Sequence, residues 1–517
     1  MAECNECDQL SDAEALARLG EMIDRAADTN DAVMNDAALA CSEHLASRSS
    51  LNGEQCVLCH YFRANAFENR LSFAGERQSW AWDIPYLQNV LLELRQAVGH
   101  EAFENLSPFR RCQIFTNLGN KLNAVGRPVE ALVYWDRAIE TNPNFAMALA
   151  NRGNGLSNYG NALYDEGHFG LFLLLAYDSF AAASGKDAVF DSPENYNEYK
   201  PQFEQAALRA AEWLNLDDAR ADLTREFGLG RSKPQQLYRS WCLENRLFLN
   251  PLNDLGAFSI AAHDVLHLPS LTMGIEDGGA EPPVAFGFYN QLKQELVSAR
   301  WLFYEGLTEQ KGHFSDNGTH LYDTLSIPSY SLGTEKTKLA FRMAYSLFDK
   351  IAFFINDYFK VGLAERDVSF RAIWFDRKGN PKPLRAVFEK RENWPLRGLY
   401  WLSKDLYEPT FCDVAEPEAK GAADLRNHLE HKYCQVYEDM GVGYSRFATA
   451  LNGKGLGFRI GREELDSKTL HILKLARAAL IYLSLAVHRE EQVRQSDSGD
   501  ALVVSMPLRM WNERGRL

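Results

Sequence analysis

The sequence predicts a mainly α-helical protein, in which an array of repeated helices precedes a four-helix bundle with an insertion. Three observations support this prediction. Strand signals are sparse along the 517 residues, and apolar residues recur at helical spacing in almost every segment. A helical pattern also repeats after 34 residues in the second quarter of the chain.

The composition is that of a globular protein large enough for two or three domains. Charged residues make up 24% of the chain and hydrophobic residues 46%, so the chain can bury an ordinary core. The net charge of −15 argues against sequence-independent coating of nucleic acid. A local basic cleft stays compatible with that charge, because the local field governs the encounter.

Neither a signal peptide nor a membrane span is expected. The first residues are acidic and polar rather than basic and then apolar. The longest apolar runs, near 169–177 and 479–487, are shorter than the roughly 20 residues that a span needs. The sequence therefore predicts a cytoplasmic protein that does not enter a membrane.

Nine scattered cysteines favour reduced thiols over a disulfide framework. Cys56, Cys59 and His60 match a haem-attachment pattern, and Cys56 and Cys59 could also form a zinc site with Cys4 and Cys7. A simpler interpretation is that Cys56 and Cys59 are small buried residues on a helix. We expect no metal and no cofactor.

The chain divides into segments that carry helical periodicity throughout. Ala-rich helices are expected within 10–48, followed by helices near 54–70 and 84–98, and residues 199–249 continue the pattern. The predicted divisions are an N-terminal helical region (1–100), helical repeats (101–250), a loop-rich connector (251–285), a helical bundle (286–495) with an insertion (about 363–420), and a tail (496–517).

One repeat unit is well formed and a second is distorted. The unit resembles the tetratricopeptide repeat family over about 35 residues, through Phe115, Leu118, Gly119, Leu122, Ala131, Trp135, Ala138 and Pro143. In that family small residues allow two helices to cross closely, and the aromatic residue fills the layer to the next repeat. A second copy begins in register at Gly153 but regains the pattern only near Ala176, Phe180 and Ala183, after an insertion around 158–169.

Four long helices are expected in the C-terminal part, near 287–310, 334–362, 424–440 and 467–494. The second is rich in aromatic residues, as a helix buried on most sides would be. About 60 residues separate the second helix from the third. A loop of that length needs structure of its own or a function.

The most informative residues lie at the start of the predicted third helix. Arg426, Asn427 and His431 fall within its first turns, with Asp424 as the expected N-cap and Leu425, Leu429, Val436 and Met440 as the buried stripe. Asn427 and His431 share a face because they are four residues apart. Such a group can hold a phosphate and transfer a proton. The alternative is that Arg426 pairs with Glu430 as an ordinary helix ion pair.

A bundle with an Arg-Asn-x-x-x-His motif at the start of its third helix resembles the HEPN superfamily. The resemblance covers about 285–495 and implies cleavage of RNA without a metal, leaving a 2′,3′-cyclic phosphate. It implies that Arg426 holds the phosphate, that Asn427 orients the histidine or the phosphate, and that His431 transfers protons. It also implies a homodimer in which two motifs face one cleft.

The chemistry of these residue types agrees with those roles. Histidine titrates near neutral pH and can act as acid or base. The arginine fork stays charged and donates two hydrogen bonds to a phosphate. The neighbouring His428 and Lys432 are candidate RNA-binding residues, with an exposed or supporting position as the alternative for each.

Other candidate sites are weaker. His263, Asp264 and His267 could place two histidines on one helical face as metal ligands, but no third ligand is evident. No P-loop pattern is present. The glycine-rich run 453–457 is expected to be a loop, with phosphate contact as the alternative.

We therefore expect a ribonuclease whose repeat array acts as a sensor, in stress response or anti-phage defence. Expected partners are RNA, with tRNA as one candidate, a second copy of the chain, and a protein or peptide ligand on the array. Two alternatives stay open. One is an inactive scaffold that binds proteins or RNA without cleavage, and the other is a toxin silenced by a separate antitoxin.

Overall fold

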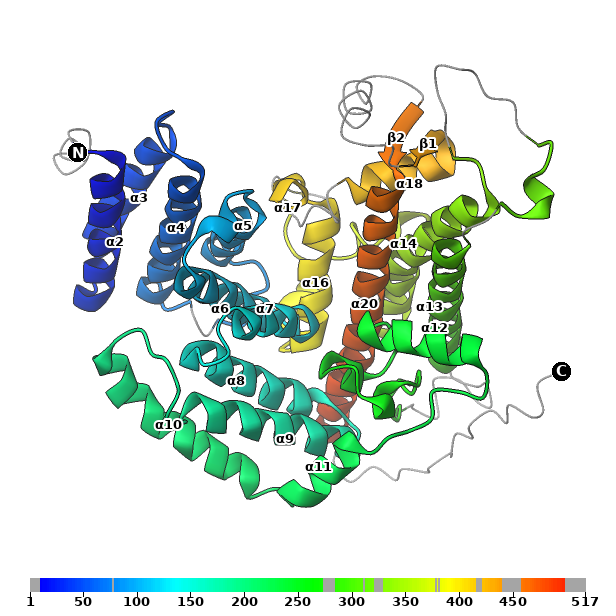
Figure 1. Ribbon diagram of the computed structural model, residues 1–517, viewed down its shortest axis with the longest axis horizontal. Coiled ribbons are helices and arrows are strands. Elements are labelled where there is room, and N and C mark those ends of the chain that lie inside the picture. The colour runs from blue at the N-terminus through cyan, green and yellow to red at the C-terminus, as the bar shows by residue number, and fades with distance from the viewer. Residues whose placement is uncertain are drawn as a thin grey trace.

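The computed structural model is mainly α-helical, as the sequence predicts, and the strands within its described residues form a single two-stranded parallel pair. The helices form an array on one side of the molecule and a second group on the other (Figure 1). The structure describes residues 10–76, 79–272, 284–309, 312–319, 329–376, 379, 382–414, 421–438 and 457–497.

The first helices form a small core of their own. Helix α2 (Asp12–Thr29) begins at Ser11, whose hydroxyl and the Glu14 carboxylate cap each other's backbone N–H groups. It packs against α3 (Ala32–Ala46) and α4 (Gly53–Phe73). Cys59 is buried on α4 and Cys56 is half-buried, both with free thiols, which supports their interpretation as helix residues. Cys4 and Cys7 lie outside the described residues.

Successive helices then pack as pairs along the array. The pairs are α4 with α5 (Pro85–Gly99), α6 (Pro108–Ala124) with α7 (Pro128–Thr141), and α8 (Ala146–Ala162) with α9 (Glu166–Ala183). The repeat-like helices expected from the sequence are therefore present.

Trp135 joins the two repeat units. A Cβ added at Gly119 on α6 or at Gly155 on α8 would collide with its indole ring, so both helices approach the ring only because these residues are glycines. Gly153 and Phe180 form the matching contact in the second unit. The part of α8 after Gly153 is about one turn longer than the part of α6 after Gly119, and the part of α9 before Phe180 is about two turns longer than the part of α7 before Trp135. The insertion around 158–169 therefore lies largely in helical residues.

Two more helices pack on α9 and complete the array, and a third lies against the C-terminal part, where Tyr238 contacts Trp301 and Tyr304. The three helices are α10 (Pro193–Ala211), α11 (Leu216–Thr224) and α12 (Lys233–Glu244), followed by short 3-10 turns at Pro251–Asp254 and Ser259–Ala261. The connector is partly buried. Asp254 is 1% exposed and accepts a hydrogen bond of 2.5 Å from Arg477, so this loop is held against the last helix.

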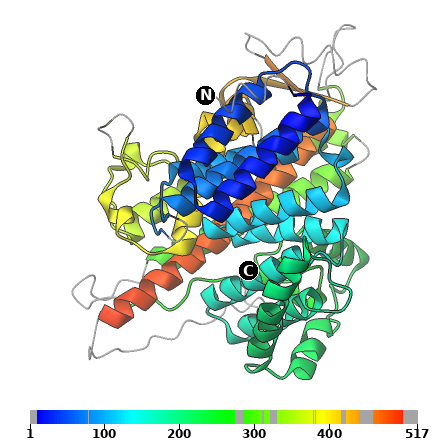
Figure 2. The ribbon, with the colours of Figure 1, turned by 90° about the vertical axis from the view of Figure 1, so that its left-hand side faces the viewer.

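The C-terminal group is built on three long helices and one shorter one. The long helices are α13 (Val284–Thr308), α14 (Leu332–Tyr358) and α20 (Arg462–Asp497), and Figure 2 shows α20 running the length of the molecule. By length and composition α20 could cross a membrane, but 83% of its most apolar window is buried inside the protein. A buried core helix has the same composition.

The prediction of a third long helix over 424–440 is wrong. Helix α18 spans only Ala422–His431, and strand β1 (Tyr433–Tyr437) follows and pairs in parallel with β2 (Gly457–Gly461). The position of Val436 is compatible with a helix, because it lies seven residues after Leu429, and also with a strand, because it lies two residues after Cys434. The alternation of buried Cys434 and Val436 belongs to the strand. Met440 lies outside the described residues.

The fourth helix of the group comes from the segment expected to be an insertion. Helix α16 (Trp394–Tyr407) begins at Asn393, whose side chain accepts a hydrogen bond from the backbone of Leu396, and it is buried on nearly all sides. It packs against α20 and, on its other side, against the array (Figure 1). Segment 363–420 thus supplies part of the core.

The contact between α16 and the array is close and charged. Gly126 and Gly398 meet backbone to backbone, where a Cβ on either would overlap the other chain segment. Asp405 accepts hydrogen bonds from Arg95 on α5, at 2.5 and 2.8 Å, and from Arg127 before α7. Burial opposes ionisation of Asp405, but the two guanidinium groups outweigh it and lower its pKa to about 2.

Candidate active site

The motif lies on α18, at one end of the C-terminal helices (Figure 1). The helix begins one turn earlier than predicted. Gly421, with φ of 73°, is the N-cap, and Asp424 lies in the first turn rather than at the cap. Leu425 is fully buried and α18 packs on α14, which fixes the face of the helix that carries the motif.

The three motif residues differ in their surroundings. Asn427 and His431 are exposed and lie one turn apart on the same face. Arg426 is half-buried, and its guanidinium lies 5.9 Å from the centre of the Tyr345 ring on α14. A cation over an aromatic face keeps its charge while its position is restricted.

Glu430 is engaged by an arginine other than Arg426. Arg342 on α14 donates hydrogen bonds of 3.0 and 2.8 Å to its two carboxylate oxygens. These bonds lower the pKa of Glu430, and the nearby charges of Arg426 and His431 add to the effect. Within the described residues Arg426 forms no ion pair, so the alternative of an Arg426–Glu430 helix pair is wrong.

Two tyrosines lie beneath Arg426, of which Tyr345 is buried and Tyr407 is half-buried. The rings of Tyr345 and Tyr407 meet edge to face with centres 6.3 Å apart, and Tyr407 is the last residue of α16. Burial raises the pKa of Tyr345 to about 12, and burial also raises the pKa of Tyr407. Both phenols therefore stay neutral at physiological pH and do not cancel the charge of Arg426.

His428 and Lys432 lie in different environments. The His428 ring is half-buried, 5.1 Å from the Phe458 ring on β2, and its Nδ1 lies 2.8 Å from the backbone oxygen of Asp424. Lys432 is exposed at the C-cap of α18. Both stay predicted RNA-binding residues.

The tertiary structure adds neighbours that the sequence reasoning missed. Arg342 comes from the aromatic α14, and Tyr433 follows the motif directly in β1. The prediction of a helix as far as 440 left Tyr433 out of the site, although the alternation of Tyr433 and Gln435 with Cys434 and Val436 is also compatible with a strand.

The candidate metal residues do not form a site. The segment around His263 and His267 is not helical, so the two imidazoles do not share a helix face. Asp264 instead pairs with Arg300 at 2.9 and 2.8 Å and accepts from the backbone of Leu249. Among the described residues no group of three or more His, Cys, Asp or Glu is arranged to hold an ion. Of the glycine-rich run, 453–456 lie outside the described residues and Gly457 begins β2.

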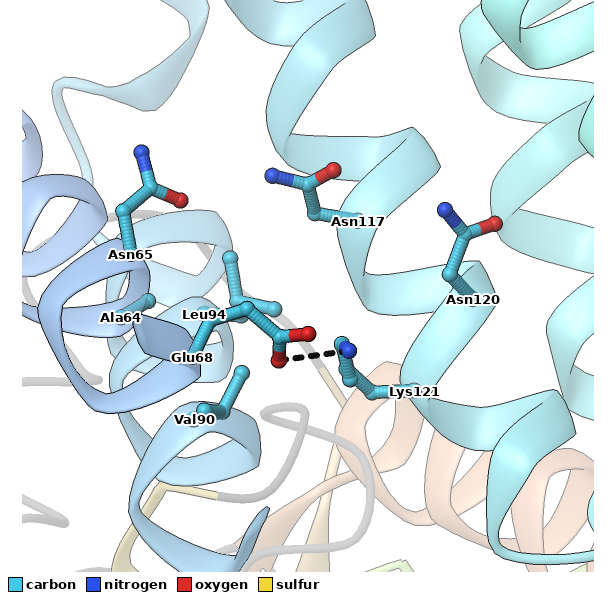
Figure 3. Close-up of a pocket in the computed structure, with 8 residues that line it drawn as sticks. All are labelled: Ala64, Asn65, Glu68, Val90, Leu94, Asn117, Asn120 and Lys121. Carbon is cyan, nitrogen blue, oxygen red and sulfur yellow. Dashed lines mark ion pairs between the residues drawn. The ribbon is translucent and has the colours of Figure 1, made fainter. Parts of the chain in front are cut away.

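A second candidate site is a pocket of about 150 Å³ on the array, between α4 and α6 (Figure 3). Three half-buried asparagines line it around an apolar floor, and Glu68 and Lys121 form an ion pair of 2.6 Å at one end. Trp135 donates a hydrogen bond of 3.0 Å to the Oδ1 of Asn120. The pocket-lining asparagines are Asn65, Asn117 and Asn120.

Comparison with known proteins places the C-terminal helices in a family. Residues 277–490 match the family described as LA2681-like HEPN. The match spans α13, α14, α16, α18 and α20, and therefore includes the motif. No curated protein and no solved structure matches significantly. Residues 277–490 of this chain are therefore a HEPN-like domain that is similar to the LA2681-like family, and an array of repeat-like helices precedes it.

Proposed function

We propose that this chain is a metal-independent endoribonuclease of the HEPN type. The observation that carries the proposal is the exposure and the pairing of the motif residues on α18. Asn427 and His431 are exposed on one face, and Arg426 is left without a carboxylate partner among the described residues because Arg342 holds Glu430. A charged guanidinium can bind the phosphate and an exposed imidazole can transfer a proton, and cleavage through a 2′-hydroxyl uses both functions.

In the proposed reaction the 2′-oxygen of RNA attacks the adjacent phosphorus. The new bond closes a 2′,3′-cyclic phosphate while the bond to the 5′-oxygen breaks. A base takes the proton of the 2′-hydroxyl, and an acid gives a proton to the departing 5′-oxygen. His431 is the proposed proton-transfer group, Arg426 neutralises the phosphoryl oxygens, and Asn427 orients the imidazole or the phosphate.

One chain supplies one motif histidine, whereas the reaction uses an acid and a base. We therefore propose a two-fold dimer in which the α18 helices of both copies face one groove. The exposed positions of Asn427, His431 and Lys432 leave this face open to a second copy. In this arrangement the two copies of His431 act on opposite sides of the phosphate.

The proposed role of the array is regulation. Helix α16 touches the array through Asp405 and ends at Tyr407, two residues later, beneath Arg426. A protein or peptide bound to the array, with the asparagine-lined pocket as the candidate position, would act on the motif through this helix. The proposed setting is stress response or anti-phage defence, with RNA such as tRNA as the target.

The alternative function is an inactive scaffold that uses the array to bind proteins. The asparagine-lined pocket is the observation in its favour, since amide side chains can recognise a peptide backbone without any catalytic step.

The test is to incubate the purified chain with mixed cellular RNA in excess EDTA and to map the ends of any fragments. Fragments ending in 2′,3′-cyclic phosphates and 5′-hydroxyls are expected, and a His263→Ala variant should produce the same pattern. An absolute requirement for Mg²⁺ or Mn²⁺ would reject the mechanism. Intact RNA under every condition would favour the scaffold.

A further inference from the structure

Tyr433 is a large aromatic side chain that stays exposed next to the motif. It is the first residue of β1, it is 44% exposed, and it follows the exposed His431 and Lys432 directly. Lys432 already has an extended backbone, so Tyr433 is carried away from the helix end along the strand. The three residues are consecutive in the chain, and each of them is exposed.

The Tyr433 ring is held in place although it is exposed. Its hydroxyl lies 2.7 Å from the Tyr330 hydroxyl and accepts a hydrogen bond of 2.6 Å from the Gln435 amide. The Gln435 oxygen in turn accepts from the Tyr437 hydroxyl at 2.7 Å and from Arg459 on β2 at 3.1 Å. A network on two strands and a neighbouring segment therefore orients the ring.

The residue opposite Tyr433 leaves one side of the ring uncovered. In the parallel register Tyr433 pairs with Gly457, where an added Cβ would lie 3.4 Å from the ring. A side chain at position 457 would fit there and would cover the ring. Glycine at this position therefore keeps the aromatic surface accessible.

We infer that Tyr433 is a stacking platform for an unpaired RNA base beside the scissile phosphate. An aromatic face stacks on any base, and a ring that is already oriented loses little conformational entropy on binding. Tyr433 lies two residues from His431, which corresponds to about 7 Å along an extended chain, so the stacked base belongs to a nucleotide next to the reacting one. The bases of duplex RNA are closed to such stacking, so the inferred substrate is single-stranded or looped RNA.

This inference rests on the proposed function, and a binding experiment can separate the two. The His431→Ala chain, which cannot complete cleavage in the proposed mechanism, is titrated with a fluorescent single-stranded oligoribonucleotide and with the same strand in a duplex. Adding Tyr433→Ala should weaken single-strand binding roughly 5- to 100-fold and leave duplex binding unchanged. Tyr433→Phe keeps the ring and should retain most of the binding.

Tyr196 on α10 provides the matched control. It is 42% exposed and its hydroxyl also accepts a hydrogen bond, from Lys200, but it lies on the array far along the chain from the motif. Tyr196→Ala should leave both affinities unchanged.

The possible outcomes are distinct. If the wild-type chain does not cut RNA but single-strand binding depends on Tyr433, the ribonuclease proposal fails and the platform stands. If the chain cuts RNA and Tyr433→Ala binds single strands as tightly as its parent, the platform is rejected. If Tyr433→Ala changes only the association of two chains, measured by analytical ultracentrifugation, the ring belongs to the dimer contact and the inference is overturned.

Discussion

Arg342 on α14 holds both carboxylate oxygens of Glu430 on α18, at 3.0 and 2.8 Å. Glu430 lies four residues after Arg426 and directly before His431, and the charges of both residues act on it. The long-range pair therefore decides which arginine the carboxylate neutralises. Arg342 on α14 pairs with the Glu430 carboxylate, and no described carboxylate pairs with Arg426.

The Arg342–Glu430 pair gives a test of this arrangement. Arg342→Ala should lower the rate of RNA cleavage about 10-fold, equivalent to about 1.4 kcal/mol, because Glu430 can then pair with Arg426 at helical spacing. Adding Glu430→Gln to the same chain should restore most of the rate, since the amide carries no charge. The exposed Arg371→Ala is the control and should cut RNA at the wild-type rate.

Failure of Glu430→Gln to rescue would contradict this positioning role and would point to a direct contact between Arg342 and RNA.

Substitution of the motif histidine should reduce activity without affecting folding. His431 is exposed at the end of α18, so His431→Ala should change the thermal midpoint by no more than a surface substitution does, equivalent to about 0.5 kcal/mol. RNA cleavage should fall by roughly 100-fold or more, because a positioned proton-transfer group contributes about that much. A variant with wild-type cleavage would show that His431 is not the proton-transfer group.

Mixing two inactive chains tests the proposed dimer. An Arg426→Ala chain and a His431→Ala chain should recover part of the cleavage when mixed, because a heterodimer still contains one copy of each residue in the shared groove. Each chain mixed with itself is the control and should stay inactive. An active monomer in sedimentation experiments would reject the composite site.

Asp405 should make stability depend on pH in the acidic range. Its folded pKa is about 2, below the ordinary value of 3.8, so its contribution to stability is complete above about pH 4 and is lost as the pH falls toward 2. Asp405→Asn should lower the free energy of unfolding at pH 7 by about 3 kcal/mol, because Arg95 loses its buried partner. Urea unfolding at pH 7, 5 and 3.5 should show an equal loss at the first two values and a smaller loss at the third.

The exposed Asp28 is the matched control for that series, and Asp28→Asn should cause little change at any pH. A loss for Asp405→Asn that is independent of pH down to 3.5 would contradict the role of its ionised form.

The local sequence pattern was sufficient to predict the structure of the repeat unit, but not that of the segment after the motif. Gly119 and Trp135 lie at spacings that predict their contact, because the spacing within a helical hairpin is set by the helix itself. Residues 433–437 carry a pattern compatible with either helix or strand. These residues form a strand rather than a helix because they pair with β2, which begins 20 residues later. The periodicity near the motif contains no information about that partner.

The segment 363–420 is a second case in which the local sequence pattern did not predict the tertiary arrangement. The N-cap Asn393 and Pro395 are start signals for a helix, yet the sequence gives no indication that α16 lies between α20 and the array. That position depends on Arg95 and Arg127 reaching Asp405 from about 300 residues away in the chain. Contacts over such separations depend on the assembled core.

By itself the sequence determined the helical class, the repeat-like array and the position of Arg426, Asn427 and His431 on one helix, because these follow from spacing within single helices. Only the tertiary structure decided where α18 ends, that Arg342 pairs with Glu430, that Arg426 lies over Tyr345, and that Tyr433 is exposed at the start of a strand. The physical reason is the distance along the chain over which each kind of interaction acts. Helical spacing follows from backbone geometry within a few residues, whereas ion pairs, ring contacts and strand partners form only when distant segments bury a common core.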